Sequence, residues 1–561
     1  MMSPSKNEIV LRMEESAPCS MISGVIWTIS KTRKSLSSWR AWNGGGPVRD
    51  DIRELTASSV ARFTPATMRR GHEEVLIVGA GPTGLFTACE LVRHGVRPRI
   101  IDQELHAHTQ TRATGVQPAA LELLHRAGLA EKFLATGVPV VGLRILDHQW
   151  EEAFAMQPPA EVTPYAHTIS MAQWQTEQIL AERLRDEGIE VERGTRAVGF
   201  DIRDDGAVVK CTLSDGETFE IEADYLVGSG GAHSPVRDAL HEPLAGITYP
   251  KKYFVADVAS RGAHRGDNYL SVGISPRGML MVAALPLGRT LVVCDLPDGL
   301  EPGKMPTKDD AQRIVNAHLT RPFEIVDVRW ASVYRTHRRM SPTFRAGRSF
   351  LAGDAAHLCS PLGGEGMNSG FLDGASLAWM LGAVLRRGAR PTLLDAYDPE
   401  RRDVARQVLA SSEAMYDFYY TLVAQAEAGQ TLHVPPEDPT RHPTSPAMLG
   451  LAIHESPILG MSGTVIGAGR LRCGSRFAGN TKLIAPLHHL LVFGNPPGLE
   501  ECADTWKHAL KVVDGPSIST PAECGVSNQG AALIRPDGYI GFVADPWDPV
   551  AFDRYFGELF V

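Results

Sequence analysis

Apolar and polar positions form their clearest pattern between residues 74 and 102. Val75 to Val78 is a continuous apolar run, Thr83 to His94 carries helix-forming residues with an apolar face, and Arg99 to Ile101 leads a second short run into Asp102. A short apolar run bounded by glycine is typical of a buried strand, whereas apolar residues on one face are typical of a helix. The segment therefore predicts a strand, a helix and a second strand.

The same reasoning predicts elements along the rest of the chain. Helices are predicted over Pro118 to Arg126, Gln173 to Glu187, Ala311 to Leu319, Phe371 to Arg387, Leu393 to Glu427 and Val550 to Leu559. Strands are predicted over Arg196 to Arg203, Ala207 to Leu213, Glu217 to Ile221, Tyr225 to Val227, Tyr253 to Val258, Met279 to Leu285, Thr290 to Asp295, Glu324 to Trp330, Ser349 to Ala352, Leu490 to Phe493, Lys511 to Val513 and Tyr539 to Val543. The strands between residues 250 and 335 predict a mostly antiparallel inserted sheet that forms one wall of a substrate pocket.

These patterns divide the chain into four parts. Residues 1–70 show no sustained period and predict a disordered extension, with Met68 as a natural alternative start. Residues 74–430 form the predicted core, residues 431–480 are a linker rich in proline, histidine and glycine, and residues 481–561 form a small α/β unit.

Composition narrows the class of protein. The net charge of −9 disfavours an extended nucleic-acid surface. No apolar run reaches the roughly 20 residues that span a bilayer. The eight cysteines are scattered without C-x-x-C, which favours a reducing cytoplasm over a disulfide scaffold. No cysteine–histidine cluster has the spacing of structural zinc, and no metal site is predicted.

The turn after the first strand carries candidate chemistry. Gly79, Gly81 and Gly84 have the spacing G-x-G-x-x-G. The first glycine permits the tight turn, the second lets backbone approach a pyrophosphate, and the third lets helix and strand pack closely. The helix N-terminus offers free N–H groups to phosphates. With Asp102 placed to hold a ribose hydroxyl, this first glycine turn predicts a dinucleotide site for NAD or FAD.

Two further glycine segments follow predicted strands. The second glycine turn is Gly228-Ser229-Gly230-Gly231, and the third glycine segment is GDAAHLCSPLGGEGMNSG at residues 353–370. Together with the first turn they resemble the FAD-dependent aromatic hydroxylases of the para-hydroxybenzoate hydroxylase and phenol hydroxylase type, over about Glu74 to Tyr420. The C-terminal unit resembles the thioredoxin-like domain of the phenol hydroxylase and polyketide-tailoring branch. It lacks C-x-x-C, which argues against redox work by that domain.

The resemblance implies an α/β fold. Its parts are a Rossmann-like FAD domain of the glutathione reductase type, an inserted antiparallel sheet at about 250–335 and a C-terminal thioredoxin-like α/β domain. It implies that Arg112 contacts FAD phosphate, that Gln173 lies against the dinucleotide and that Asp354 accepts a ribityl hydroxyl. The full set of expected FAD contacts is Gly79, Gly81, Pro82, Thr83, Gly84, Asp102, Gln103, Arg112, Gln173, Asp354, Pro361, Gly363, Gly364, Gly366, Met367 and Asn368.

Three residues depart from the family pattern. Asp102 replaces the more usual glutamate. Gly230 replaces the aspartate of the usual G-A-D-G turn, while Ser234 and Arg237 keep their places. Glu365 stands where glutamine is usual, and a carboxylate near a flavin opposes its reduction to an anion unless it is protonated or turned away.

The implied reaction is hydroxylation of a phenolic or other electron-rich ring. NAD(P)H reduces FAD, reduced flavin and O₂ form a C4a-hydroperoxide, and its terminal oxygen passes to the ring. A base that ionises the phenol would strengthen the nucleophile. The candidates are Tyr253, Tyr334, His337 and Arg338, although for each a structural role is the stronger expectation. His357 is interpreted as a packing and hydrogen-bonding residue.

Other functions stay open at this point. One alternative is a tailoring or resistance monooxygenase acting on a bulky polyketide or antibiotic. Another is a flavoprotein that has lost monooxygenation, for which Gly230 and Glu365 are the support. A halogenase or hydrolase is disfavoured because W-x-W-x-I-P, G-x-S-x-G and H-E-x-x-H are absent. A homodimer is an expectation of the family alone.

Overall fold

The computed structural model describes residues 71–561, except 112, 157–162, 264–267, 301–305, 434–447, 464–471, 478–480 and 525. The side chains of residues 461–463 are also left out. The predicted N-terminal extension and Arg112 therefore lie outside the described residues.

A mostly parallel sheet forms the base of the fold, in the order β17-β18-β11-β1-β2-β8, with β10 paired to β11 and β9 paired to β10. Its strands are β1 (Gly71–Val78), β2 (Arg99–Asp102), β8 (Glu192–Arg193), β9 (Thr195–Arg203), β10 (Gly206–Leu213), β11 (Thr218–Gly228), β17 (Arg345–Ala346) and β18 (Ser349–Leu351). Helix α3 (Pro82–Arg93) connects the parallel neighbours β1 and β2, as the first hydrophobic pattern predicts.

Strand β11 is continuous where the sequence predicted two strands. Its first half pairs antiparallel with β10, with Phe219 opposite Cys211, and its second half pairs parallel with β1, with Tyr225 opposite Val75. In the sequence, the polar residues Glu222 and Asp224 resemble a break between two strands. They occupy the outward positions of an alternating strand, so the pairing continues through them.

The inserted sheet has the order β19-β16-β12-β15-β14-β13-β5-β6. Its strands are β5 (Leu143–Leu146), β6 (Glu152–Met156), β12 (Ala245–Arg261), β13 (Leu270–Ser275), β14 (Gly278–Leu285), β15 (Arg289–Asp295), β16 (Glu324–Met340) and β19 (His357–Leu358). The sheet thus extends beyond the predicted 250–335. It also recruits β5 and β6 from far upstream through the parallel β5–β13 pairing. A small third sheet has the order β3-β7-β4. Its strands are β3 (Gly115–Val116), β7 (Thr168–Ser170) and β4 (Val138–Val140).

The remaining helices cover these sheets. They are α4 (Pro118–Arg126), α5 (Ala130–Thr136), α6 (Gln173–Asp186), α7 (Pro235–Ala239), α8 (Lys308–His318), α9 (Gly366–Arg386) and α10 (Tyr397–Glu427). Helix α9 begins at Gly366 rather than at the predicted Phe371. The residues before Phe371 resemble a loop in the sequence because they are rich in glycine, which has a low helix propensity.

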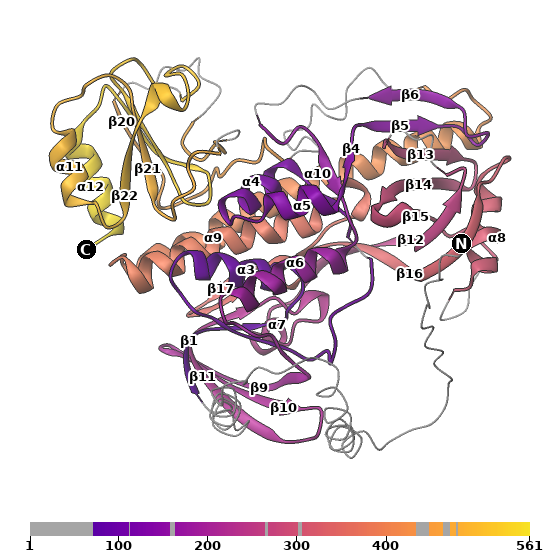
Figure 1. Ribbon diagram of the computed structural model, residues 1–561, viewed down its shortest axis with the longest axis horizontal. Helices are drawn as coiled ribbons and strands as arrows, with labels where there is room; N and C mark the ends of the chain where they lie inside the picture. Colours follow the sequence, from indigo (N-terminus) through magenta and orange to yellow (C-terminus); the bar gives the residue numbers. More distant parts are fainter. Residues whose placement is uncertain are drawn as a thin grey trace, which may run out of the picture. The chain divides into compact units, whose positions relative to one another are not determined.

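Helices α3 and α9 lie side by side in Figure 1 and approach closely along a face of glycines. A Cβ at Gly370 would lie 2.2 Å from Thr83 Oγ1, and one at Gly374 would lie 2.5 Å from Thr87 Oγ1. A Cβ at Gly382 would lie 2.5 Å from His94 Cβ. Larger residues on this face would force the helices apart.

The C-terminal unit is a five-stranded sheet in the order β20-β24-β23-β21-β22. Its elements are β20 (Gly460–Gly463), β21 (His488–Val492), α11 (Leu499–Thr505), β22 (Leu510–Asp514), β23 (Ala531–Ile534), β24 (Ile540–Asp545) and α12 (Pro549–Leu559). Strand β20 comes from the stretch predicted as a linker, so that stretch contributes an edge of the sheet. The thioredoxin-like assignment stays a prediction.

A buried ionic cluster attaches this unit to the core. Both terminal nitrogens of Arg535 donate to the Glu400 carboxylate at 2.7 Å. Asp537 also accepts from Arg535 and from Trp379 Nε1, at 2.6 and 2.8 Å. Arg535 and Asp537 belong to the turn Arg535-Pro536-Asp537-Gly538, which the sequence predicts as a hairpin turn without indicating that its charges are buried.

Candidate functional site

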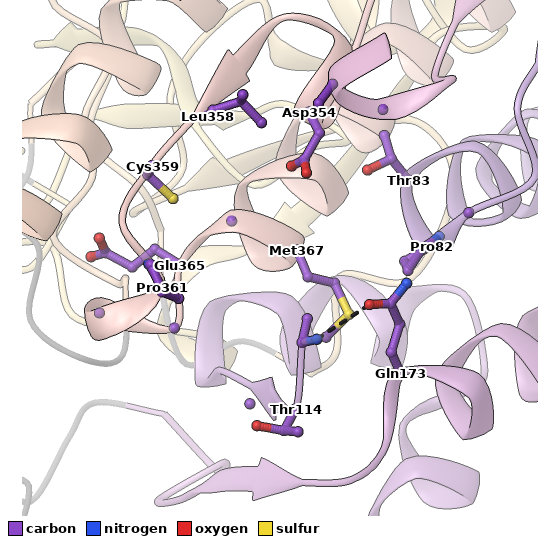
Figure 2. Close-up of a pocket in the computed structure, with 18 of the residues that line it drawn as sticks. Pro82, Thr83, Thr114, Gln173, Asp354, Leu358, Cys359, Pro361, Glu365 and Met367 are labelled. Atoms are coloured by element: carbon purple, nitrogen blue, oxygen red, sulfur yellow. Dashed lines mark hydrogen bonds between the residues drawn. The ribbon is translucent and has the colours of Figure 1, made fainter. Parts of the chain in front are cut away.

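A cavity of about 760 Å³ lies where the glycine segments meet the inserted sheet. Its lining comes from the first glycine turn, the second glycine turn, the third glycine segment, the inserted sheet and α10. Figure 2 shows Thr83 of α3 and Asp354 of the third glycine segment reaching into the same space from different elements. The three separated sequence signals therefore form one site.

The first glycine turn has the division of roles that its spacing predicts. Gly79 has φ of +110°, and a Cβ there would lie 2.6 Å from the Ser229 backbone. A Cβ at Gly84 would lie 2.0 Å from the Gly79 carbonyl oxygen. A Cβ at Gly81 would meet no atom within 4 Å and would project into the cavity lining. Two glycines serve packing, and the middle one leaves space for a ligand.

The start of α3 can hold an anion. The helix begins with Pro82, and no side chain caps it. The first N–H groups of a helix lack intrahelical partners and carry the positive end of the helix dipole. This end of the cavity suits a diphosphate.

Asp102 fixes the shape of the first turn. Its Oδ2 accepts from the Ala80 N–H at 2.6 Å, and its Oδ1 accepts from the Glu104 N–H at 2.8 Å. The side chain also lines the cavity beside Gln103. A carboxylate oxygen can accept more than one hydrogen bond, so these contacts leave capacity for a ribose hydroxyl.

The second glycine turn packs against the first. Ser229 donates from its N–H to Val78 O at 2.9 Å and from Oγ to Gly79 O at 2.8 Å. Gly230 and Gly231 expose backbone to the cavity where the family carries an aspartate. The buried Arg237 donates to Ala355 O at 3.3 Å and so connects this turn with the third glycine segment.

The backbone before Asp354 is held from behind by a buried aspartate that the sequence interpretation missed. Asp373 accepts from Gly353 N–H at 2.9 Å, from Arg401 Nε at 2.8 Å and from His357 Nε2 at 2.8 Å. Burial alone would raise its pKa, but His357, Arg401 and these hydrogen bonds lower the pKa of Asp373 to about 2. His357 thus packs and forms hydrogen bonds as expected. A charged residue inside the apolar helix from Phe371 was the sequence signal for this anchor.

Hydrogen bonds of Asn368 and of the cavity-lining Gln117 hold the third glycine segment in place. Asn368 Nδ2 donates to the Gly115 and Gly364 carbonyl oxygens, each at 2.8 Å. Gln117 Nε2 donates to Gly363 O at 3.0 Å. The fully buried Asn368 does not line the cavity, and neither does Gly84. The other expected cofactor residues that the structure describes do line it.

Gln173 lies at the cavity wall opposite the third glycine segment. Its Oε1 accepts from the Ala113 N–H at 3.2 Å, and its Nε2 donates to Glu177 at 2.9 Å. Gln173 and Pro82 both line the cavity, and both are labelled in Figure 2. The side chain is therefore held in a fixed orientation beside the first turn.

Glu365 is 1% exposed and lies under the third glycine segment. Ser411 Oγ donates to its Oε1 at 2.8 Å, and its Oε2 has no hydrogen-bond partner. Burial raises the pKa of Glu365 to about 8, with Ser411 opposing the shift. The raised pKa favours the protonated carboxyl at neutral pH, and Figure 2 shows it directed away from Asp354 and Met367.

Of the four candidate bases, only Tyr334 lines the cavity. Tyr253 shares a hydrogen bond of 2.6 Å with Tyr420, His337 Nδ1 contacts Thr248 at 2.9 Å, and Arg338 pairs with Glu413 at 3.2 Å. Burial raises the pKa of both Tyr253 and Tyr334, so each keeps its proton at neutral pH.

Membrane-spanning helices and clustered metal ligands are both absent from the described part of the chain. None of its helices is long and apolar enough to cross a bilayer. No group of three or more potential metal ligands occurs among the same residues.

Comparisons with known proteins agree with this geometry. Residues 72–412 match the family model "FAD binding domain", and residues 470–558 match "Aromatic-ring hydroxylase, C-terminal". The 6-methylpretetramide 4-monooxygenase of Streptomyces rimosus is 32% identical over 83% of this chain and 90% of its own length. The pentachlorophenol 4-monooxygenase of Sphingobium chlorophenolicum is 31% identical over 61% of this chain and 64% of its own. The structure of OxyS anhydrotetracycline hydroxylase from Streptomyces rimosus is 28% identical and covers 87% of this chain and 99% of its own, with a TM-score of 0.69.

Proposed function

The chain belongs to the FAD-dependent aromatic-ring monooxygenases, and from that premise we propose that it inserts one oxygen atom of O₂ into a phenolic or other electron-rich aromatic ring, with NAD(P)H as reductant. The family match confirms the predicted flavoprotein class and the α/β FAD-binding fold. The observation that carries the proposal is the convergence of three glycine segments and the inserted sheet on one cavity.

The residues around the cavity fit FAD. Gly81 leaves open space beside an uncapped helix start, which suits the diphosphate. We assign Asp102 and Gln103 to the ribose, Asp354 to the ribityl chain and Gln173 to the wall beside them. We assign the cavity-lining backbone at Pro361, Gly363, Gly364, Gly366 and Met367 to the flavin ring. The contact between Arg112 and phosphate is proposed on the family resemblance alone.

The flavin, when bound, supplies hydride acceptance from NAD(P)H and activation of O₂, for which no side chain suffices. The protein positions the substrate ring and excludes water. A neutral Glu365 would add no negative charge beside a bound flavin. Tyr334 keeps its proton and can donate a hydrogen bond to the substrate rather than remove a proton from it.

A second candidate is a tailoring or resistance monooxygenase that acts on a bulky polyketide or antibiotic. The 6-methylpretetramide relative matches over 83% of this chain, whereas the pentachlorophenol relative matches over 61%. The former includes more of the chain beyond the FAD-binding part. Similarity to the 6-methylpretetramide enzyme beyond the FAD-binding part supports this second candidate.

Oxidation of NADPH and NADH by the FAD-loaded protein tests the function. A panel of phenols and aromatic polyketides is added in turn, and the products are identified by mass. Strong stimulation with a product 16 Da heavier would support the proposal. FAD-loaded protein that oxidises neither cofactor under any condition would contradict it and would implicate Gly230 and Glu365.

We also propose that the protein acts in the cytoplasm, on the basis of its cysteine usage. The seven cysteines that the structure describes are all free thiols. A homodimer remains a proposal from the family. Gel filtration of the FAD-loaded protein tests it.

A further inference from the structure

The part of the cavity beyond the third glycine segment is a chamber of apolar side chains. The inserted sheet and α10 supply its walls. Its main apolar side chains are Leu143, Met156, Met281, Leu291, Val293 and Met415. We call this part the substrate chamber, and the inference about it rests on the proposed function.

Positive charge lies at the other end of the cavity. Among the described lining residues Arg196 is the one arginine, and no lysine is present. Arg196 lies in β9, which packs against β2 near Asp102. His108 and His233 accompany the loop after β2 and the second glycine turn. These groups face the dinucleotide end, so none of the described cations lines the substrate chamber.

Three titratable side chains, each from a different wall of the chamber, have pKa values raised by burial. Tyr334 comes from β16, Tyr419 from α10 and Glu365 from the start of α9. Burial raises the pKa of all three, and no neighbouring cation opposes the shift in any of them. The one opposing contact is the Ser411 hydrogen bond to Glu365. Each wall therefore favours neutral groups.

A substrate anion placed here would lose its hydration without gaining a counter-ion from the described lining residues. Burying an unpaired carboxylate or phenolate is strongly unfavourable. We propose that the substrate chamber binds an uncharged aromatic compound whose phenol keeps its proton, and that it rejects benzoate-type acids. Because no described side chain in the chamber ionises the ring, the substrate must be electron-rich through its own substituents, as a polyhydroxylated or fused-ring phenol is.

Binding of two matched ligand pairs to the FAD-loaded enzyme tests this proposal. One pair is methyl 4-hydroxybenzoate and 4-hydroxybenzoate. The other is 1,8-dihydroxy-3-methylanthraquinone and 1,8-dihydroxyanthraquinone-3-carboxylate. Dissociation constants are measured at pH 7 from the change in flavin absorbance. In each pair, we expect the neutral ligand to have a dissociation constant at least about tenfold lower than that of its acid. Binding of the ester should weaken as the pH passes the ligand's own phenol pKa.

Charge-altering variants locate the cause of this selectivity. Met415→Arg places a cation on the α10 wall, and Met415→Gln is the matched polar variant without charge. Met281→Arg places a cation on the inserted sheet and serves if the first variant does not fold. The arginine variants should bind the acid more tightly than the wild type by about tenfold. The glutamine variant should keep the wild-type preference.

The outcomes separate this inference from the proposed function. Equal or tighter binding of an acid by the wild type, with NAD(P)H-driven hydroxylation, would overturn the inference and leave the function intact. Failure of both arginine variants to recruit the acid would also overturn it. Binding of no aromatic ligand together with no NAD(P)H oxidation would overturn both.

Discussion

Glu365 is a carboxyl whose charge is set by burial. Its ordinary pKa is 4.5, and in the folded protein burial raises the pKa to about 8. The folded chain therefore holds this proton more tightly than the unfolded chain. The stability that results is fully present below pH 4.5 and is lost as the pH rises through 8.

Glu365→Gln tests this linkage. Glutamine imitates the protonated carboxyl, so the variant should unfold at nearly the same temperature as the wild type at a pH below 4.5. Above pH 8 it should be more stable by on the order of 1 kcal/mol or more. Thermal unfolding of both proteins from below pH 4.5 to above pH 8 measures the difference. Ser411→Ala is the companion variant and should move the transition to higher pH. A difference that does not change with pH would contradict the assignment.

Gly81 offers a second test at the level of one residue. Its backbone has φ of −75°, which alanine adopts without strain, and the added Cβ would meet only the cavity. Gly81→Ala should therefore fold normally and bind FAD about tenfold more weakly. FAD titration followed by fluorescence measures this. Gly557→Ala in α12, where a Cβ comes no closer than 3.8 Å to another group, is the control and should leave FAD binding unchanged. Equal FAD affinity in both variants would refute the placement of FAD against Gly81.

Much of the cavity lining could be predicted from sequence, because glycine spacing and strand ends are local signals. Gly79, Gly81 and Asp354 all lie at the cavity. The supports behind it could not be predicted in the same way. Asp373 and Arg401 pair with each other across 28 residues, from two different helices, and such a pairing has no local pattern.

At the scale of elements, the paired helices α3 and α9 set the geometry of the site. Gly374→Ala should separate them, because its Cβ would lie 2.5 Å from Thr87 Oγ1. Overpacking of this kind costs about 1–3 kcal/mol, which exceeds the gain of up to about 1 kcal/mol in helix propensity. Denaturant unfolding measures the loss.

The matched control combines Thr87→Ala with Gly374→Ala in a double variant. It removes the atom that the new Cβ would meet, so the double variant should be at least as stable as Thr87→Ala alone. A double variant that keeps the full loss would show that the clash lies elsewhere.

The elements differ in how far their sequence anticipates them. Helix α4 has the predicted limits Pro118–Arg126, because it has a clear amphipathic period and an N-terminal proline. The addition of β5 and β6 to the inserted sheet was missed, since their partner β13 lies more than a hundred residues downstream. Strand pairing over such distances is decided by tertiary packing rather than by local preference.

At the scale of the whole molecule, α10 links the C-terminal unit with the substrate chamber. Its N-terminal half carries Glu400, which pairs with Arg535 of the C-terminal unit, and its second half supplies Met415 and Tyr419 to the cavity. Burial disfavours the charge of Arg535, but Asp537 and Glu400 outweigh burial and hold its pKa well above the ordinary value. This cluster therefore contributes to the attachment of the two parts, beside contacts such as the buried Arg476–Glu122 pair.

Glu400→Ala should remove the ion pair between α10 and Arg535 of the C-terminal unit. It leaves the fully buried Arg535 with Asp537 as its remaining carboxylate, and breaking a buried ion pair costs about 3–5 kcal/mol. Calorimetry should show a lower unfolding temperature, and FAD should be released at a lower denaturant concentration. Glu400→Ala combined with Arg535→Met removes both charges and should recover much of the loss, because an apolar pair of similar volume replaces the ion pair. If the double variant were as unstable as the single one, the loss would come from packing of α10 rather than from the unpaired guanidinium, and the ionic cluster would not be what joins the two parts.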